Sequence, residues 1–187
     1  AVGRFVAKKG PLQTLQAFAR MRELLPREER EAARLVMVGD GPLLEPARER
    51  VRQLGLEAVV QLPGLADRTR VVALMRVARA FVQHSCVAPD GDSEGSPVAV
   101  MEAQLCGLPV VATHHAGIPE VVQDGVSGLL VAEGDVEGMA QAMARLALDP
   151  QLAARQGLAG KQRVAARFTV EHHLRAVSAL IQAVAAR

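Results

Sequence analysis

The sequence has no tryptophan, no tyrosine and only two cysteines among its 187 residues. Cys86 and Cys106 are far apart and form no CxxC pair, which argues against a disulfide framework and for a reducing compartment. Long hydrophobic runs are also missing, since no apolar stretch approaches the ~18 residues of a membrane-spanning helix. The chain starts at Ala1 without the charged start and apolar core of a secretory signal. We therefore expect a cytoplasmic protein.

An excess of one charge sign is absent as well. Lys and Arg number 22, Asp and Glu number 20, and 50% of the residues are hydrophobic. This balance is typical of a globular protein and argues against disorder or nucleic-acid binding. The basic run Arg48, Arg50 and Arg52 alternates with Glu45 and Glu49, as on a solvated helix face. Peripheral association with the inner face of a membrane stays open as the alternative for such a surface.

Short runs rich in β-branched residues alternate with longer helical patterns along the first 150 residues. Strands are predicted over residues 35–38, 59–62, 80–83, 110–113 and 129–131. Helices are predicted over residues 11–25, 44–54, 68–77, 97–106 and 136–148. This alternation predicts an α/β fold, a Rossmann-like doubly wound parallel sheet with helices on both faces. Ligands bind beyond the carboxyl ends of the strands in such sheets.

The length permits one α/β domain and is short for a complete two-domain enzyme. We expect a core over residues 1–150 and two helices over 151–168 and 170–186, which together form one domain. The last helix carries an apolar stripe that either packs on the sheet or lacks support. This stripe consists of Leu174, Val177, Leu180, Ile181 and Val184.

A predicted helix start near residue 97 offers an anion-binding site. Ser96 is a good N-cap and Pro97 a good first helical residue, so the amide of Val98 would point out of the positive helix end. A phosphate group binds well at such an end, here beside Gly95.

Two glutamates flank this helix start. Glu94 lies in the loop before the cap, and Glu102 lies in the second turn, about 7 Å further along the axis. One carboxylate can accept hydrogen bonds from a ribose and the other from a sugar. The apolar neighbours Val100, Met101 and Ala103 argue against a solvated position for Glu102.

The pair Glu94 and Glu102, with seven residues between them, is followed by further motifs. These are Leu-Pro-Val-Val-Ala-Thr at 108–113, Gly-Ile-Pro-Glu at 117–120 and Asp-Gly-Val-Ser-Gly-Leu-Leu-Val at 124–131. In this order they resemble the C-terminal, donor-binding half of retaining glycosyltransferases of family 4, the glycosyl transferases group 1. That family has the GT-B fold and an E-x7-E signature. The loop at 90–95 is similar to the branch that makes the exopolysaccharides colanic acid and amylovoran.

The resemblance implies a role for each matching residue. Arg4 and Lys9 would hold the diphosphate of a nucleotide sugar and stabilise the leaving group. Glu102 would bind the ribose, and Glu94 would contact the donor sugar or stabilise charge at the reacting carbon. The residues with implied catalytic roles are Glu94, Arg4 and Lys9. The implied donor-binding set is Gly3, Arg4, Lys9, Gly39, Asp40, Gly41, Pro63, Gly64, Glu94, Gly95, Ser96, Pro97, Val98 and Glu102.

Two segments of this set, 39–41 and 63–64, can also be explained by backbone structure alone, without a contact to the nucleotide. Gly39, Asp40 and Gly41 fit a tight turn from strand to helix as well as they fit a nucleotide contact. Pro63 and Gly64 are similar to the family's base-reading segment, which contacts the base mainly through its main chain. The side chains therefore leave the identity of the base open.

We expect no metal site. Asp90, Asp92 and Glu94 mimic the opening of a calcium loop, yet the twelfth position, which needs a bidentate glutamate, is Met101. The histidines lack ligand spacing, and we expect the pair at 114–115 to be loop residues without an assigned role.

The resemblance and these motifs together imply the donor-binding domain of a retaining hexosyltransferase that uses a UDP- or GDP-hexose and no obligatory cofactor. The acceptor would be a glycan or a lipid-linked sugar in polysaccharide biosynthesis. Its partners would be the nucleotide sugar and an N-terminal GT-B domain that is absent here, so the isolated chain would be inactive. Two alternatives stay open: half of a GT-B sugar-nucleotide epimerase, and a Rossmann-like interaction module without a ligand.

Overall fold

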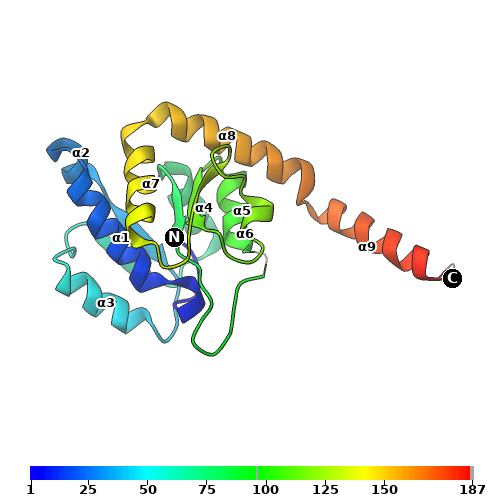
Figure 1. Cartoon of the computed structure of the whole chain (residues 1–187), viewed down its shortest axis with the longest axis horizontal. Helices are drawn as coiled ribbons and strands as arrows, with labels where there is room; N and C mark the ends of the chain where they lie inside the picture. The colour runs from blue at the N-terminus through cyan, green and yellow to red at the C-terminus, as the bar shows by residue number, and fades with distance from the viewer. Residues whose placement is uncertain (96, 186–187) are drawn as a thin grey trace.

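The computed structural model describes residues 1–95 and 97–185 as helices packed around short parallel strands (Figure 1). The strands are β1 (Leu35–Val38), β2 (Val60–Gly64), β3 (Phe81–Gln83), β4 (Val110–Thr113) and β5 (Gly128–Val131). The helices up to residue 148 are the 3₁₀ helix η1 (Ala7–Lys9), α1 (Pro11–Leu24), α2 (Arg27–Ala32), α3 (Leu44–Gln53), α4 (Arg68–Val77), α5 (Val98–Leu105), α6 (Ile118–Val121) and α7 (Val136–Leu148). Two helices follow them, α8 (Pro150–Arg167) and α9 (Val170–Ala185).

The strands form two parallel groups. β1 pairs with β2, and β4 lies between β3 and β5. The predicted parallel α/β fold is therefore confirmed. The prediction of one continuous sheet is wrong for the described residues, because β1 and β3 are not hydrogen-bonded to a common strand. The segment before Arg4 contributes a single bridge, between Val2 and Val38.

Helices cover both faces of the strands, as a doubly wound fold requires. In β4, Val111 packs in a cluster with Leu15 of α1 and Met139 of α7. Its neighbours Val110 and Ala112 pack in a second cluster, formed with α5 and α6. Successive side chains of a strand point to opposite faces, so both faces of β4 are buried.

Local sequence signals account for several helix starts. Asp67, Asp135 and Asp149 each accept a hydrogen bond from the amide three residues later and so cap α4, α7 and α8. At the start of α1, Gly10 has a φ of 49° and is followed by Pro11. A Cβ on Gly10 would lie 1.9 Å from the carbonyl oxygen of His84, so only glycine fits there.

The structure corrects several predicted boundaries. α5 begins at Val98 with Pro97 as its N-cap, so Pro97 is not the first helical residue. The predicted cap Ser96 lies outside the described residues, as does residue 186 at the predicted end of the last helix. Pro63 and Gly64 complete β2 instead of following it. The prediction also lacks η1, α2 and α6, which are too short to show a helical period.

The last helix, α9, has no buried residue and extends beyond α8, away from the strands (Figure 1). Its apolar side chains face solvent, with Ile181 63% and Val184 74% exposed. Of the two alternatives for the apolar stripe, the lack of support is therefore the correct one for this chain.

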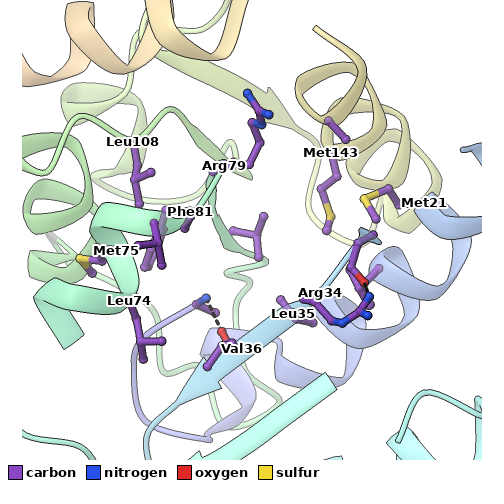
Figure 2. A pocket seen from close by; sticks show the side chains of 18 of the residues that line it. Met21, Arg34, Leu35, Val36, Leu74, Met75, Arg79, Phe81, Leu108 and Met143 are labelled. Atoms are coloured by element: carbon purple, nitrogen blue, oxygen red, sulfur yellow. Dashed lines mark hydrogen bonds between the residues drawn. The ribbon is translucent and has the colours of Figure 1, made fainter. Parts of the chain in front are cut away.

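A cavity of about 520 Å³ separates β1 from β3 (Figure 2). Leu35 and Val36 line it from β1, and Phe81 lines it from β3. The amino group of Ala1 donates a hydrogen bond to the carbonyl oxygen of Val36 at 2.9 Å. Burial lowers the pKa of this amine from 8.0 to about 5. The break between the two groups of strands lies at this cavity.

Candidate functional site

Four loops meet at the carboxyl ends of the strands. They are the segment 3–10, which crosses beside the end of β1, and the loops that follow β3, β4 and β5. Hydrogen bonds connect them: Lys9 of the first segment and His115 after β4 both contact Glu94, which lies after β3. His115 in turn contacts Glu133, which follows β5. This edge is where ligands bind in open α/β sheets.

The central contact is an ion pair between Lys9 and Glu94. Lys9 Nζ donates to Glu94 Oε2 at 2.5 Å, and the Glu94 side chain is only 6% exposed. Lys8 Nζ lies 3.9 Å from the other carboxylate oxygen of Glu94 and donates to Asp92 Oδ1 at 3.0 Å. The structure therefore brings together two predicted site residues that lie 85 positions apart in the sequence.

The main chain of Glu94 is held by a second set of contacts. The Glu94 amide donates to His115 Nε2 at 3.0 Å, and His115 Nδ1 lies 2.5 Å from Glu133 Oε1. The other oxygen of Glu133 accepts the Val87 amide at 3.0 Å. The hydrogen bond with His115 lowers the pKa of the Glu133 carboxyl group below its usual range.

A second buried histidine supports the same loops. His84 Nε2 accepts the Gly134 amide at 2.9 Å, and His84 Nδ1 has no hydrogen-bond partner among the described residues. Burial lowers the pKa of His84, so its neutral form is favoured. Burial also raises the pKa of the nearby Cys86 thiol, which disfavours the reactive thiolate.

Arg4 and Gly3 lie next to Lys9. Together with Thr14 and Gln83 they line a small cavity of about 20 Å³, roughly the size that one water molecule needs. Arg4 itself is exposed. The much larger cavity of Figure 2 lies between β1 and β3, and its lining includes none of the predicted site residues.

Glu102 does not share in these contacts. It is exposed on α5, whereas Val100 and Ala103 are fully buried. The inference that its apolar neighbours disfavour a solvated position is wrong, because α5 buries the face that contains Val100 and Ala103 and leaves Glu102 outside. At the start of the same helix Pro97 is buried and Val98 is 62% exposed.

The glycines at 39 and 41 have a structural reason. A Cβ on Gly39 would lie 1.9 Å from the Gly3 carbonyl oxygen, and one on Gly41 would lie 2.6 Å from the Phe5 carbonyl oxygen. They are needed because the segment 3–5 crosses directly over this turn. Asp40 is exposed and accepts the Gly41 amide at 2.7 Å.

The segment at 63–64 and the residue Gly95 before α5 take part in this edge through main-chain hydrogen bonds. Gly64 has a φ of 78° and its carbonyl oxygen accepts the Gly39 amide, while Pro63 is exposed. The Gly95 carbonyl oxygen accepts the Gly117 amide at 3.2 Å. The first contact joins the turn at 39–41 to the end of β2, and the second joins the loop before α5 to the loop after β4.

Sequence reasoning missed Lys8, His115 and Glu133 as members of this cluster. A signal was available, because His84, His115 and Glu133 each lie within two residues of the carboxyl end of one of three neighbouring strands. Within residues 1–95 and 97–185 there is no group of three or more His, Cys, Asp or Glu residues that could hold a metal ion. In the same residues, no helix has the length and apolar character to cross a membrane.

Comparison with known proteins gives a consistent result. The profile of the family Glycosyl transferases group 1 matches residues 1–163. The putative colanic acid biosynthesis glycosyltransferase WcaL of Escherichia coli is 39% identical over 144 residues, which are 77% of this chain and 34% of WcaL. The amylovoran biosynthesis glycosyltransferase AmsK of Erwinia amylovora is 39% identical over 110 residues, 59% of this chain and 27% of AmsK.

More distant relatives share most of the chain. A GDP-mannose-dependent phosphatidylinositol monomannoside mannosyltransferase of Mycolicibacterium smegmatis is 33% identical over 162 residues, covering 86% of this chain and 41% of that protein. The crystal structure of Anabaena Alr3699/HepE in complex with UDP superposes with a TM-score of 0.79 and 25% identity, covering 97% of this chain and 48% of HepE. The chain thus spans less than half the length of these relatives. The predicted resemblance to GT-B glycosyltransferases, and to the colanic acid and amylovoran branch among them, is confirmed.

Proposed function

The chain belongs to the glycosyl transferases group 1 family, and on that premise we propose that it is the donor-binding domain of a retaining glycosyltransferase. In this proposal residues 1–150 form the binding core and residues 151–187 the C-terminal helices of one domain. An N-terminal domain outside this sequence supplies the acceptor site. The isolated chain then binds the donor without transferring the sugar.

The observation that carries the proposal is the contact between Lys9 and Glu94 at 2.5 Å. A lysine ammonium donates hydrogen bonds to phosphate oxygens, and a carboxylate accepts them from sugar hydroxyls. A nucleotide sugar presents both groups side by side. Lys9 and Glu94 therefore match the diphosphate and the sugar of one ligand, the roles that the family resemblance assigns to them.

The proposed roles follow from how charge moves in the reaction. When the bond between sugar C1 and the diphosphate oxygen breaks, negative charge builds on the leaving oxygen, and Arg4 and Lys9 stabilise it. Glu94 accepts hydrogen bonds from the donor sugar, and Glu102 accepts them from the ribose. The acceptor hydroxyl oxygen then bonds to C1 on the face that the diphosphate left, and its proton passes to the departing diphosphate oxygen. No metal ion is required, because Arg4 and Lys9 supply the positive charge.

The donor is a UDP- or GDP-hexose in this proposal. The HepE crystal structure contains UDP, and the mycobacterial relative is named for GDP-mannose, so the family accommodates either base. The names of WcaL and AmsK support a role in the biosynthesis of an exopolysaccharide, with a glycan or lipid-linked acceptor. We place this activity in the cytoplasm, at or near the inner face of the membrane where such acceptors lie.

The test is a calorimetric titration of the 187-residue chain with UDP, GDP and ADP at fixed salt. We expect one of UDP and GDP to bind in the micromolar to millimolar range and ADP to bind more weakly. Arg4→Ala and Glu102→Ala should each weaken binding about tenfold, since each removes a hydrogen bond that involves a charged group.

Matched controls are Arg27→Ala and Glu57→Ala. Both residues are exposed, and Arg27 lies on α2, which precedes the amino end of β1, at the opposite edge from the site. Their substitution should leave the dissociation constant unchanged. The proposal fails if Arg4→Ala and Glu102→Ala bind like the unsubstituted chain while circular dichroism shows them folded. It also fails if the folded chain binds neither UDP nor GDP.

A further inference from the structure

The loop between β3 and α5 is tied down at two points by one histidine–glutamate pair. His115 Nε2 accepts the Glu94 amide at 3.0 Å, and Glu133 Oε2 accepts the Val87 amide at 3.0 Å. The pair itself is joined by the 2.5 Å contact between His115 Nδ1 and Glu133 Oε1. Residues that follow β4 and β5 thus hold this loop at Val87 and at Glu94.

The geometry defines which nitrogen of His115 carries the proton. A backbone amide can only donate, so His115 Nε2, which faces the Glu94 amide, must be the acceptor. The proton of the neutral ring is then on Nδ1, where it is donated to the Glu133 carboxylate. His115 is only 3% exposed, so water has little access to its two ring nitrogens.

We propose that His115, oriented by Glu133, is a positioning residue that holds the main chain of Glu94 so that its carboxylate faces the donor sugar. This inference rests on the proposed function, in which Glu94 contacts that sugar. The carboxylate lies beside Lys9, and its own backbone amide is anchored to the imidazole. Loss of the anchor leaves a buried amide without an acceptor and allows the loop to move.

Two substitutions of His115 separate its two hydrogen bonds. Glutamine can place an acceptor oxygen near the position of Nε2, so His115→Gln keeps a partner for the Glu94 amide. Asparagine reaches only the position of Nδ1, so His115→Asn can still donate to Glu133 but loses the contact with Glu94. His114→Asn is the matched control. His114 is the exposed neighbour, and within residues 1–95 and 97–185 only its main chain is hydrogen-bonded, to Val131.

The first readout is the affinity ratio between a nucleotide sugar and its nucleoside diphosphate, measured by calorimetry with UDP-glucose against UDP and with GDP-mannose against GDP. We expect His115→Asn to lower the ratio about tenfold, the loss expected for one hydrogen bond. Affinity for the nucleoside diphosphate alone should stay within twofold. His115→Gln and His114→Asn should keep the ratio within threefold.

The second readout is amide hydrogen exchange at Glu94, followed by NMR. His115→Asn should accelerate this exchange at least tenfold, whereas His115→Gln and His114→Asn should not. Unchanged exchange in a folded His115→Asn variant overturns the anchor. An unchanged affinity ratio in that variant, or equal affinities of the unsubstituted chain for sugar and diphosphate forms, overturns the role toward the sugar. Failure of the chain to bind any nucleotide contradicts the proposed function, while the exchange result still decides the anchor.

Discussion

The ion pair between Lys9 and Glu94 should contribute measurably to stability, which a double-mutant cycle can test. The two side chains are 18% and 6% exposed, and their charged atoms lie 2.5 Å apart. At an effective dielectric constant of 20 their attraction is about 7 kcal/mol. Desolvation of two poorly exposed charges cancels most of this gain, so we expect a coupling energy of about 2 kcal/mol.

The neighbouring pair Lys8 and Asp92 is a natural control. Its atoms lie 3.0 Å apart, but Asp92 is 56% exposed, so solvent screens the attraction. A coupling energy below about 1 kcal/mol is expected for this pair. The comparison uses adjacent lysines of one helical turn, so the substitutions disturb the same backbone.

The assay is urea unfolding at pH 7 of Lys9→Met, Glu94→Gln and the double variant, and of Lys8→Met, Asp92→Asn and their double variant. Lys9→Met alone should cost about 3 kcal/mol, because it leaves the Glu94 carboxylate buried with Lys8 Nζ still 3.9 Å away. A coupling energy for Lys9 and Glu94 no larger than that of the control pair would refute this reasoning. It would mean that Glu94 is solvated by motion of its loop.

Two further outcomes follow from other parts of the chain. Gly10→Ala should lower the free energy of unfolding by more than about 3 kcal/mol in thermal unfolding. Gly55 has a φ of 63° and open space around it, so Gly55→Ala should lower it by about 1 kcal/mol. Equal losses for the two variants would contradict the close approach at Gly10. Truncation after Thr169 should change the free energy of unfolding by less than about 1 kcal/mol, because α9 buries no residue, and a larger loss would show that α9 packs on the core.

Elements with a clear apolar pattern were predictable residue by residue. The strands at 35–38 and 110–113 coincide with β1 and β4, because short β-branched runs bounded by loops are typical of buried parallel strands. The bounds of α1, α4 and α7 agree with the predicted helices to within one residue, because each has apolar residues at helical spacing between clear turn signals. The break between β1 and β3 was not predictable, because it depends on which strand edges meet in space and not on any local pattern.

The site divides in a similar way. Arg4, Lys9 and Glu94 could be selected because their motifs resemble those of the glycosyl transferases group 1. The role of His115 could not, because its partners Glu94 and Glu133 are 21 and 18 residues away and belong to different loops. The exposure of Glu102 was predicted wrongly, because neighbouring residue types do not say which face of a short helix is buried.

Sequence pattern alone therefore specified the α/β class, the family and the chemical groups available in each loop, because these depend on local periodicity and motif spacing. Tertiary structure alone decided which groups become partners. Lys9 meets Glu94, 85 residues away, and the His115 ring accepts the Glu94 amide, because parallel strands bring the ends of separate crossovers to one edge. Once buried there, each polar group must find its partner among whatever the converging loops provide.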